Sequence, residues 1–218
     1  MPLPPLDDPE SPAEKLRGVA CAVPTSAFLF SSLLAFNAAQ TASLGVRPIS
    51  RTTFRRINRW AADTWWSWCV EAGERLYGVE LVFSGDEVPM RENAIVLANH
   101  QQMTDITMLM AFARSKERLG DLKWLVKRAI KYVPGVGWGM WFLDCPFLDR
   151  DWTKDRASIE RTFHGLVRDR VPMWLVSFPE GTRLTAEKLE ASQRYAESRG
   201  VTPLRHVLLP RTKGFVAS

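Results

Sequence analysis

A long uncharged run near the amino terminus limits what this chain can fold into. No charged residue lies between Arg17 and Arg47, across residues 18–46. A helix of about 20 apolar residues is enough to cross a bilayer. Pro24 and Asn37 dilute the apolar character of the run, so a buried core hairpin or an in-plane segment is the alternative. We predict that residues 18–46 are embedded in a membrane, whether or not they span it.

The charges on the two sides of this run predict its orientation. Residues 1–14 hold five Pro and four acidic residues. We therefore predict a disordered tail over residues 1–17, and no cleaved signal peptide, because a basic start is missing. Five arginines follow the run: Arg47, Arg51, Arg55, Arg56 and Arg59. By the positive-inside rule, the rest of the chain should face the cytosol if the run spans the membrane.

Composition favours a membrane over nucleic acid as the anionic partner. The net charge is +5, and the chain holds nine Trp, which prefer the bilayer interface. No nucleic-acid-binding motif accompanies the charge. Three scattered Cys without metal-ligand spacing predict free thiols, and neither zinc nor cysteine catalysis. Four Trp fall within residues 54–77, which predicts a helix at the membrane surface, with an ordinary packed helix as the alternative.

From residue 78 onward, short apolar runs alternate with segments of helical spacing. Predicted strands occupy residues 79–83, 94–98, 123–126, 145–148, 173–177 and 207–209. Predicted helices occupy residues 104–116, 153–168 and 185–199. This alternation predicts an α/β domain over residues 78–218, with a mainly parallel sheet flanked by helices. It would follow membrane-embedded and interfacial helices over residues 18–77.

A histidine and a carboxylate meet at one predicted strand-to-helix turn. His100 follows the strand at residues 94–98, and Asp105 opens the helix at residues 104–116. In α/β folds such turns commonly hold the chemistry. A carboxylate that bonds one imidazole nitrogen fixes the tautomer and leaves the other nitrogen free as a general base. Judged by their spacing alone, His100 and Asp105 could also be neighbours by chance, with no catalytic role.

A second polar turn follows the strand predicted at residues 173–177. Residues 178–183 read Phe-Pro-Glu-Gly-Thr-Arg. The turn combines the backbone N–H of Gly181, the hydroxyl of Thr182 and the guanidinium of Arg183. These groups are the parts of a phosphate cradle.

Together the two turns resemble the glycerolipid acyltransferase family. Its pattern is Asn-His-x4-Asp, an Arg-bearing block, Phe-Pro-Glu-Gly-Thr-Arg and a Pro-containing strand end. All four blocks occur here in order, at residues 99–105, 147–150, 178–183 and 208–211. The resemblance is strongest to the eukaryotic lysophospholipid acyltransferase branch, which includes 1-acyl-sn-glycerol-3-phosphate acyltransferases. Members of that branch usually continue well past the last block, so we expect the domain to be C-terminally truncated here.

The resemblance implies transfer of a fatty acyl group from acyl-CoA to the free hydroxyl of a lysophospholipid. The default acceptor is 1-acylglycerol-3-phosphate, giving phosphatidic acid. His100 would take the proton of the hydroxyl, and Asp105 would orient His100. Residues 133–143, rich in Gly and Trp, would line an acyl-chain groove or form a tightly packed core loop.

The remaining site residues would bind the acceptor. Arg150 and Arg183 would hold its phosphate, with help from Gly181 and Thr182. For Arg150, an ion pair with a flanking aspartate is the alternative. Glu180 would repel a phosphate, so we expect it to orient Arg183 or to contact the glycerol hydroxyls.

The resemblance also sets the expected partners and location. Acyl-CoA would be a co-substrate, no cofactor would be required, and magnesium would at most stimulate by screening phosphates. The protein would lie in a membrane, in the endoplasmic reticulum, with its catalytic domain facing the cytosol; no protein partner is indicated. Alternatives are acylation of lysophosphatidylinositol or lysocardiolipin, or a non-catalytic membrane adaptor. A lipid-ester hydrolase is disfavoured because the chain has no Gly-x-Ser-x-Gly elbow.

Overall fold

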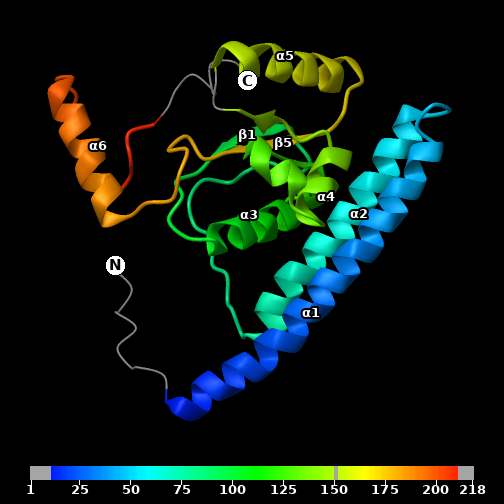
Figure 1. Cartoon of the computed structure of the whole chain (residues 1–218), viewed down its shortest axis with the longest axis horizontal. Helices are drawn as coiled ribbons and strands as arrows, with labels where there is room; N and C mark the ends of the chain where they lie inside the picture. The colour runs from blue at the N-terminus through cyan, green and yellow to red at the C-terminus, as the bar shows by residue number, and fades with distance from the viewer. Residues whose placement is uncertain (1–10, 150–151, 211–218) are drawn as a thin grey trace.

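Two long helices lie along one side of a small α/β domain (Figure 1). The computed structural model describes residues 11–149 and 152–210. In chain order the elements are α1 (Pro12–Ala42), η1 (Ser43–Gly45), α2 (Arg51–Glu71), η2 (Ala72–Leu76), β1 (Ala94–Leu97), α3 (Thr104–Ser115), η3 (Leu119–Asp121), β2 (Leu122–Trp124), β3 (Val126–Lys127), η4 (Arg128–Tyr132), α4 (Val136–Phe142), β4 (Phe147–Leu148), α5 (Trp152–Arg168), β5 (Trp174–Ser177) and α6 (Ala186–Ser198).

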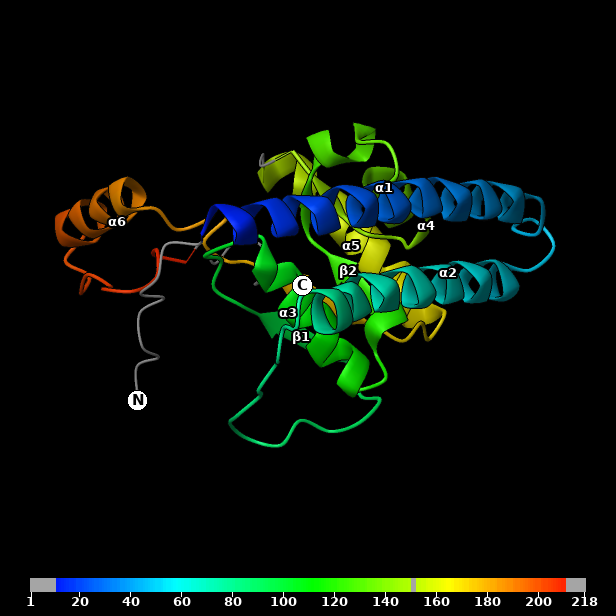
Figure 2. The ribbon, with the colours of Figure 1, turned by 90° about the horizontal axis from the view of Figure 1, so that it is seen from below.

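Helix α1 has the length and composition of a membrane-crossing helix over Lys15–Gly45. Only 6% of its most apolar 18-residue window is buried, so the alternative of a buried core hairpin does not describe it. One side of α1 packs on α2, which runs antiparallel to it (Figure 2). There the Trp65 indole N–H donates to the Leu29 carbonyl at 3.1 Å. The Phe36 and Trp68 rings meet with their centroids 5.4 Å apart.

Buried polar side chains lie where α1 ends in η1 and meets α2, and one hydrogen bond joins α2 to η1. The Asn37 amide donates to the Gln40 side-chain oxygen at 2.8 Å. The Asn58 amide, from α2, donates to the Ser43 hydroxyl at 3.1 Å. A buried amide that loses its partner costs about 1–3 kcal/mol, so sliding one helix along the other is unfavourable.

The other side of α2 contributes to the hydrophobic core of the α/β domain. Trp66 and Val70 are buried there with Met110 of α3, whereas Trp60 is 58% exposed. A helix is therefore confirmed over most of residues 54–77. Trp66 fits the interpretation as an ordinary packed helix, because it lies on the buried face of α2. Trp60 fits the interpretation as a helix at the membrane surface, because it lies on the exposed face.

The main sheet has three parallel strands in the order β1-β5-β2. A smaller parallel pair joins β3 and β4. Helices α2 and α3 lie on one face of the main sheet, where Trp174 and Val176 point, and α5 lies on the other, where Leu175 packs (Figure 1). This alternation along β5 follows from the two-residue period of a strand. The predicted class, a mainly parallel sheet flanked by helices, is confirmed.

Residues 133–143 are largely helical rather than a loop, because α4 occupies most of them. Their glycines serve close packing. A Cβ atom on Gly137 would lie 1.9 Å from the Ile130 carbonyl oxygen. The cavity that α1, α2 and α4 enclose measures only about 40 Å³, far less than the 300–1,000 Å³ of a typical ligand pocket. The packing interpretation is therefore favoured over an acyl-chain groove for this segment.

Two predicted strands, at residues 79–83 and 207–209, are wrong. Both segments are irregular, although Leu81 of the first is partly buried against the hydrophobic core and Leu208 of the second is buried. Phe83 contacts the Phe112 ring at 5.1 Å, and Leu208 is 6% exposed. Alternating hydrophobicity reports burial on one side, and here burial occurs without strand pairing.

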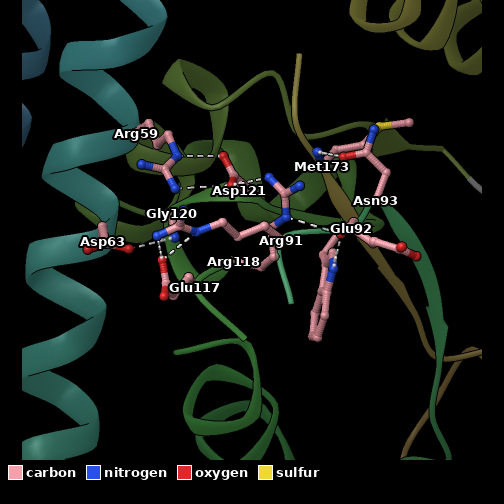
Figure 3. Close-up of polar contacts among 11 residues, drawn as sticks. Arg59, Asp63, Arg91, Glu92, Asn93, Glu117, Arg118, Gly120, Asp121 and Met173 are labelled. Atoms are coloured by element: carbon pink, nitrogen blue, oxygen red, sulfur yellow. Dashed lines mark hydrogen bonds and ion pairs between the residues drawn. The ribbon is translucent and has the colours of Figure 1, made fainter. Parts of the chain in front are cut away.

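A polar clamp holds α2 against the amino-terminal end of the sheet (Figure 3). Arg59 donates to both carboxylate oxygens of Asp121, at 2.6 and 3.1 Å. Asp63 accepts the Gly120 N–H at 3.0 Å. A Cβ atom on Gly120 would lie 2.7 Å from the Arg59 carbonyl oxygen, so glycine permits the close approach of α2 to η3.

Candidate active site

Both polar turns lie at the same end of the sheet. Strands β1 and β5 are parallel neighbours, and Leu97 pairs with Ser177 at their carboxyl ends. The turns that follow are joined directly, because the Leu184 N–H donates to the His100 carbonyl at 2.8 Å. Open parallel sheets place their ligands at this end.

His100 and Asp105 form the pair expected from the sequence. The His100 Nδ1 atom lies 2.9 Å from the Asp105 Oδ2 atom. The backbone N–H groups of Gln101 and Gln102 donate to the same oxygen, at 2.7 and 2.9 Å. Burial alone would raise the pKa of Asp105, but these hydrogen bonds, first the one from His100, lower it overall. An ionised carboxylate only accepts hydrogen bonds, so Nδ1 carries the proton and Nε2 is the basic nitrogen.

An aromatic stack supports the imidazole from one side. The Phe178 ring lies 4.2 Å from the His100 ring with an interplanar angle of 23°. Trp124 follows behind Phe178, at 6.5 Å and 21°, and is 4% exposed. Sequence reasoning missed this support, because Trp124 comes from β2, far from either turn along the chain.

Glu180 is buried, with only 6% of its surface exposed. Burial raises its pKa, while the backbone N–H groups of His100 and Leu208 act to lower it. Its Oε2 atom has no hydrogen-bond partner among the described residues. No ion pair joins Glu180 to Arg183 in the described part of the chain, so Glu180 does not hold Arg183 directly in this structure. Instead, Glu180 lies between the His100 turn and the segment of Leu208.

The rest of the second turn is more open. Gly181 has a φ of +69°, a conformation that glycine adopts readily. The Lys188 ammonium donates to the Thr182 hydroxyl at 2.9 Å and to the Arg183 carbonyl at 3.1 Å. The Arg183 side chain is exposed and forms no ion pair within residues 11–149 and 152–210. Lys188 could have been anticipated as a basic residue in the first turn of the predicted helix at residues 185–199.

Arg150 lies outside the described residues. Its neighbour Asp149 forms an ion pair with Arg128, and the Asp149 N–H donates to the Asp155 side chain at 2.7 Å. These two contacts hold Asp149, the neighbour of Arg150 in the Arg-bearing sequence block, in place. Across the described ranges, no group of three or more His, Cys, Asp or Glu side chains could hold a metal ion.

Comparison with known proteins agrees with this geometry. The Acyltransferase family model matches residues 80–217, the region that carries both turns. The chain belongs to the acyltransferase family. This confirms the resemblance that the four sequence blocks indicate. No solved structure matches the chain significantly.

Curated relatives come from plants and mammals. The chain is 38% identical over 204 residues to 1-acyl-sn-glycerol-3-phosphate acyltransferase 2 of Brassica napus, covering 91% of this chain and 52% of that protein. It is 39% identical to the Arabidopsis thaliana acyltransferase 3 of the same name, covering 79% and 47%. The corresponding gamma protein of Mus musculus is 33% identical, over 88% and 52%. The chain therefore spans about half the length of the curated relatives it matches.

Proposed function

We propose that the chain transfers a fatty acyl group from acyl-CoA to the free hydroxyl of 1-acylglycerol-3-phosphate, giving phosphatidic acid. The observation that carries the proposal is the 2.9 Å contact between His100 and Asp105. Beside it lies a turn whose Arg183 guanidinium has no ion-pair partner among the described residues. The acceptor is suggested by the names of the relatives.

In this proposal His100 is the general base. Its Nε2 atom takes the proton of the acceptor hydroxyl while the oxygen attacks the thioester carbonyl. The new C–O bond forms, the C–S bond breaks, and the leaving CoA thiolate takes the proton from His100. Asp105 holds the proton on Nδ1 and stabilises the imidazolium. A thioester is already activated, so no covalent enzyme intermediate is needed.

The second turn would bind the phosphate of the acceptor. Arg183 would form a forked pair with two phosphate oxygens, and Arg150 would approach from the neighbouring block. Thr182 would add its hydroxyl, whereas the Gly181 N–H already donates to the Phe178 carbonyl at 2.9 Å, so Gly181 would contribute only through the shape of the turn. Glu180 would lie beside the glycerol backbone of the acceptor; the single free hydroxyl of 1-acylglycerol-3-phosphate already donates to His100, so it does not also donate to Glu180. Magnesium would only screen phosphate charge, and no further cofactor is required.

The proposed setting is the endoplasmic reticulum membrane, with the catalytic domain facing the cytosol. The exposed apolar surface of α1 supports membrane association. The arginines that follow α1 favour the cytosolic side for the domain. An acceptor that forms part of a membrane would then reach the site from the bilayer.

The test is acyl transfer in isolated membranes from labelled oleoyl-CoA. The acceptor panel is lysophosphatidic acid, lysophosphatidylinositol and lysocardiolipin. We compare the wild type with His100→Ala and with His164→Ala, a matched control because His164 is exposed on α5. Loss of the general base should lower transfer by about 10² to 10⁴-fold, and His164→Ala should leave it unchanged.

Each result has a defined meaning. Labelled phosphatidic acid from the wild type and the control, but not from His100→Ala, supports the proposal. Preference for another acceptor keeps the chemistry and changes the headgroup. Equal transfer by His100→Ala refutes the general base. Lipid binding without turnover in all three proteins would support a membrane adaptor instead.

A further inference from the structure

Helix α4 and the preceding η4 expose several aromatic and aliphatic side chains. Tyr132 is 74% exposed, Trp138 46%, and Trp141 39%. Trp138 and Trp141 are three residues apart, so they lie on one face of α4. The glycines of α4 pack inward, and the indoles therefore remain outside. We call the η4–α4 surface the set Lys127, Lys131, Tyr132, Val133, Trp138 and Trp141.

The charge on this surface has one sign. No acidic residue occurs between Asp121 and Asp144. Lys127 and Lys131 are exposed, and neither has an ion-pair partner within the described part of the chain. The Arg47 guanidinium adds a third positive charge, 5.9 Å from the centroid of the Trp141 ring.

The η4–α4 surface adjoins the apolar helix α1, as Figure 2 shows. A Cβ atom on Gly135 would lie 2.7 Å from the Leu33 side chain. A Cβ atom on Gly139 would lie 3.6 Å from Asn37 and 3.7 Å from Gln40. Helix α4 therefore meets α1 near its carboxyl-terminal end.

This position extends from the headgroups toward the acyl chains, because Leu33 lies about 18 Å along the helix axis from Gly45, at 1.5 Å per residue. Gln40 is about 8 Å along the helix axis from Gly45, at 1.5 Å per residue, and Gly45 ends the candidate span. The polar layer on each side of a bilayer is about 5–8 Å thick. Tyr and Trp concentrate in this layer, and Lys near it attracts anionic lipid.

We infer that the η4–α4 surface contacts the headgroup layer of a membrane that contains anionic lipid. The aromatic rings insert at the boundary with the acyl chains, and the two lysines and Arg47 meet the lipid phosphates and carboxylates. The inference rests on the membrane association in the proposed function, but not on the acyl transfer. It gives the catalytic domain a second contact with the membrane besides α1.

The test places an environment-sensitive NBD label at Tyr132→Cys in the full chain, reconstituted into vesicles of phosphatidylcholine with phosphatidylserine. Tyr195→Cys on α6 is the matched control, because Tyr195 is 53% exposed. Exposed Cys21 is changed to Ser in both proteins. Burial raises the pKa of Cys69 to about 12 and also raises that of Cys145, so these thiols should react with the label more slowly than an exposed cysteine. Lipids that carry a shallow quencher report contact with the membrane.

The label at position 132 should be quenched by the lipid, and the label at position 195 by aqueous iodide. The double variant Lys127→Gln, Lys131→Gln should lower the ratio of lipid-quenched to water-exposed label by about fivefold for each lysine removed. This effect should disappear in pure phosphatidylcholine.

Quenching of the label at position 132 by iodide, with no lipid quenching, would overturn the inference. A response to lipid that is the same with and without phosphatidylserine would overturn its anionic part. Acyl transfer is measured on the same vesicles. If acyl transfer occurs while the label at position 132 is exposed to water, the membrane contact of the η4–α4 surface is refuted and the proposed function is not. If the label is quenched by lipid but no acyl transfer occurs, the proposed function is refuted and the membrane contact is not.

Discussion

Asp105→Asn tests the proposed chemistry most directly, because it keeps the shape of the side chain and changes its charge. The Asp105 carboxylate accepts bonds from His100, Gln101 and Gln102. All three bonds meet the same oxygen, so an amide in this place turns either its oxygen or its NH₂ group toward all three donors. If that group faces Nδ1, the imidazole carries its proton on Nε2 and cannot act as the base.

The expected loss can be worked from the contact between the two side chains. They are 15% and 22% exposed, which places the pair near the surface, where the effective dielectric constant is about 20. An imidazolium and a carboxylate with charge centres about 4 Å apart then attract by about 4 kcal/mol. The imidazolium forms only as the proton is transferred, so losing this attraction should lower kcat by about 10³-fold. The KM for the acceptor should change little, because Asp105 does not hold its phosphate.

The assay measures kcat and KM for lysophosphatidic acid with the full chain in vesicles. Asp86→Asn is the matched control, because Asp86 is exposed. Near-ultraviolet circular dichroism confirms that each variant is folded. A folded Asp105→Asn protein that keeps more than a tenth of the wild-type kcat would refute the reasoning. A loss confined to KM would move Asp105 from the chemistry to substrate binding.

Three further predictions concern binding and stability. Arg183→Lys should raise the KM for lysophosphatidic acid more than it lowers kcat, because an ammonium lacks the guanidinium fork; steady-state kinetics checks this. Burial raises the pKa of Glu180, so its contribution to stability is present below the unfolded pKa and is lost as pH rises through the folded one. Glu180→Gln should therefore raise Tm at pH 8 and not at pH 4, in thermal scans at both values. Gly120→Ala should lower the free energy of unfolding by about 1–3 kcal/mol through overpacking. In Gly165→Ala, on α5, the new Cβ atom meets nothing within 4 Å, so the free energy of unfolding should rise by up to about 1 kcal/mol. Urea unfolding measures both changes.

The pair at the centre of the site was predictable because it is local. His100 and Asp105 lie five residues apart, and the helix that positions Asp105 begins one residue before it. Hydrophobic periodicity and a strand end were enough to bring the two side chains together. The order of β1, β5 and β2 was not predictable in this way, because periodicity does not say which strands are neighbours.

Glu180 shows why the rest of the site could not be predicted. Its turn was recognised from the sequence, but the backbone N–H groups that contact its carboxylate come from His100 and from Leu208. Leu208 lies in a segment that was mistaken for a strand. The aromatic segment at residues 133–143 shows the same limit. Periodicity marks Trp138 and Trp141 as apolar, yet Gly139 takes the inner position against α1 and Gly137 the position against η4. Which side of a short helix is buried is decided by the neighbour it meets.

The two ends of the sheet separate stability from chemistry, and this can be tested with a crossed pair of variants. The clamp of Arg59 and Asp121 lies where the strands begin, and His100 lies where β1 has ended. Between them, parallel hydrogen bonding holds the three strands in register, so we expect a local shift at Gly120 to be small by the time it reaches His100. Gly120→Ala should therefore lower Tm and leave kcat per folded molecule unchanged, whereas Asp105→Asn should lower kcat with a much smaller change in Tm. If Gly120→Ala lowered kcat in fully folded protein, α2 would be mechanically coupled to the active site, and the sheet would not isolate its two ends.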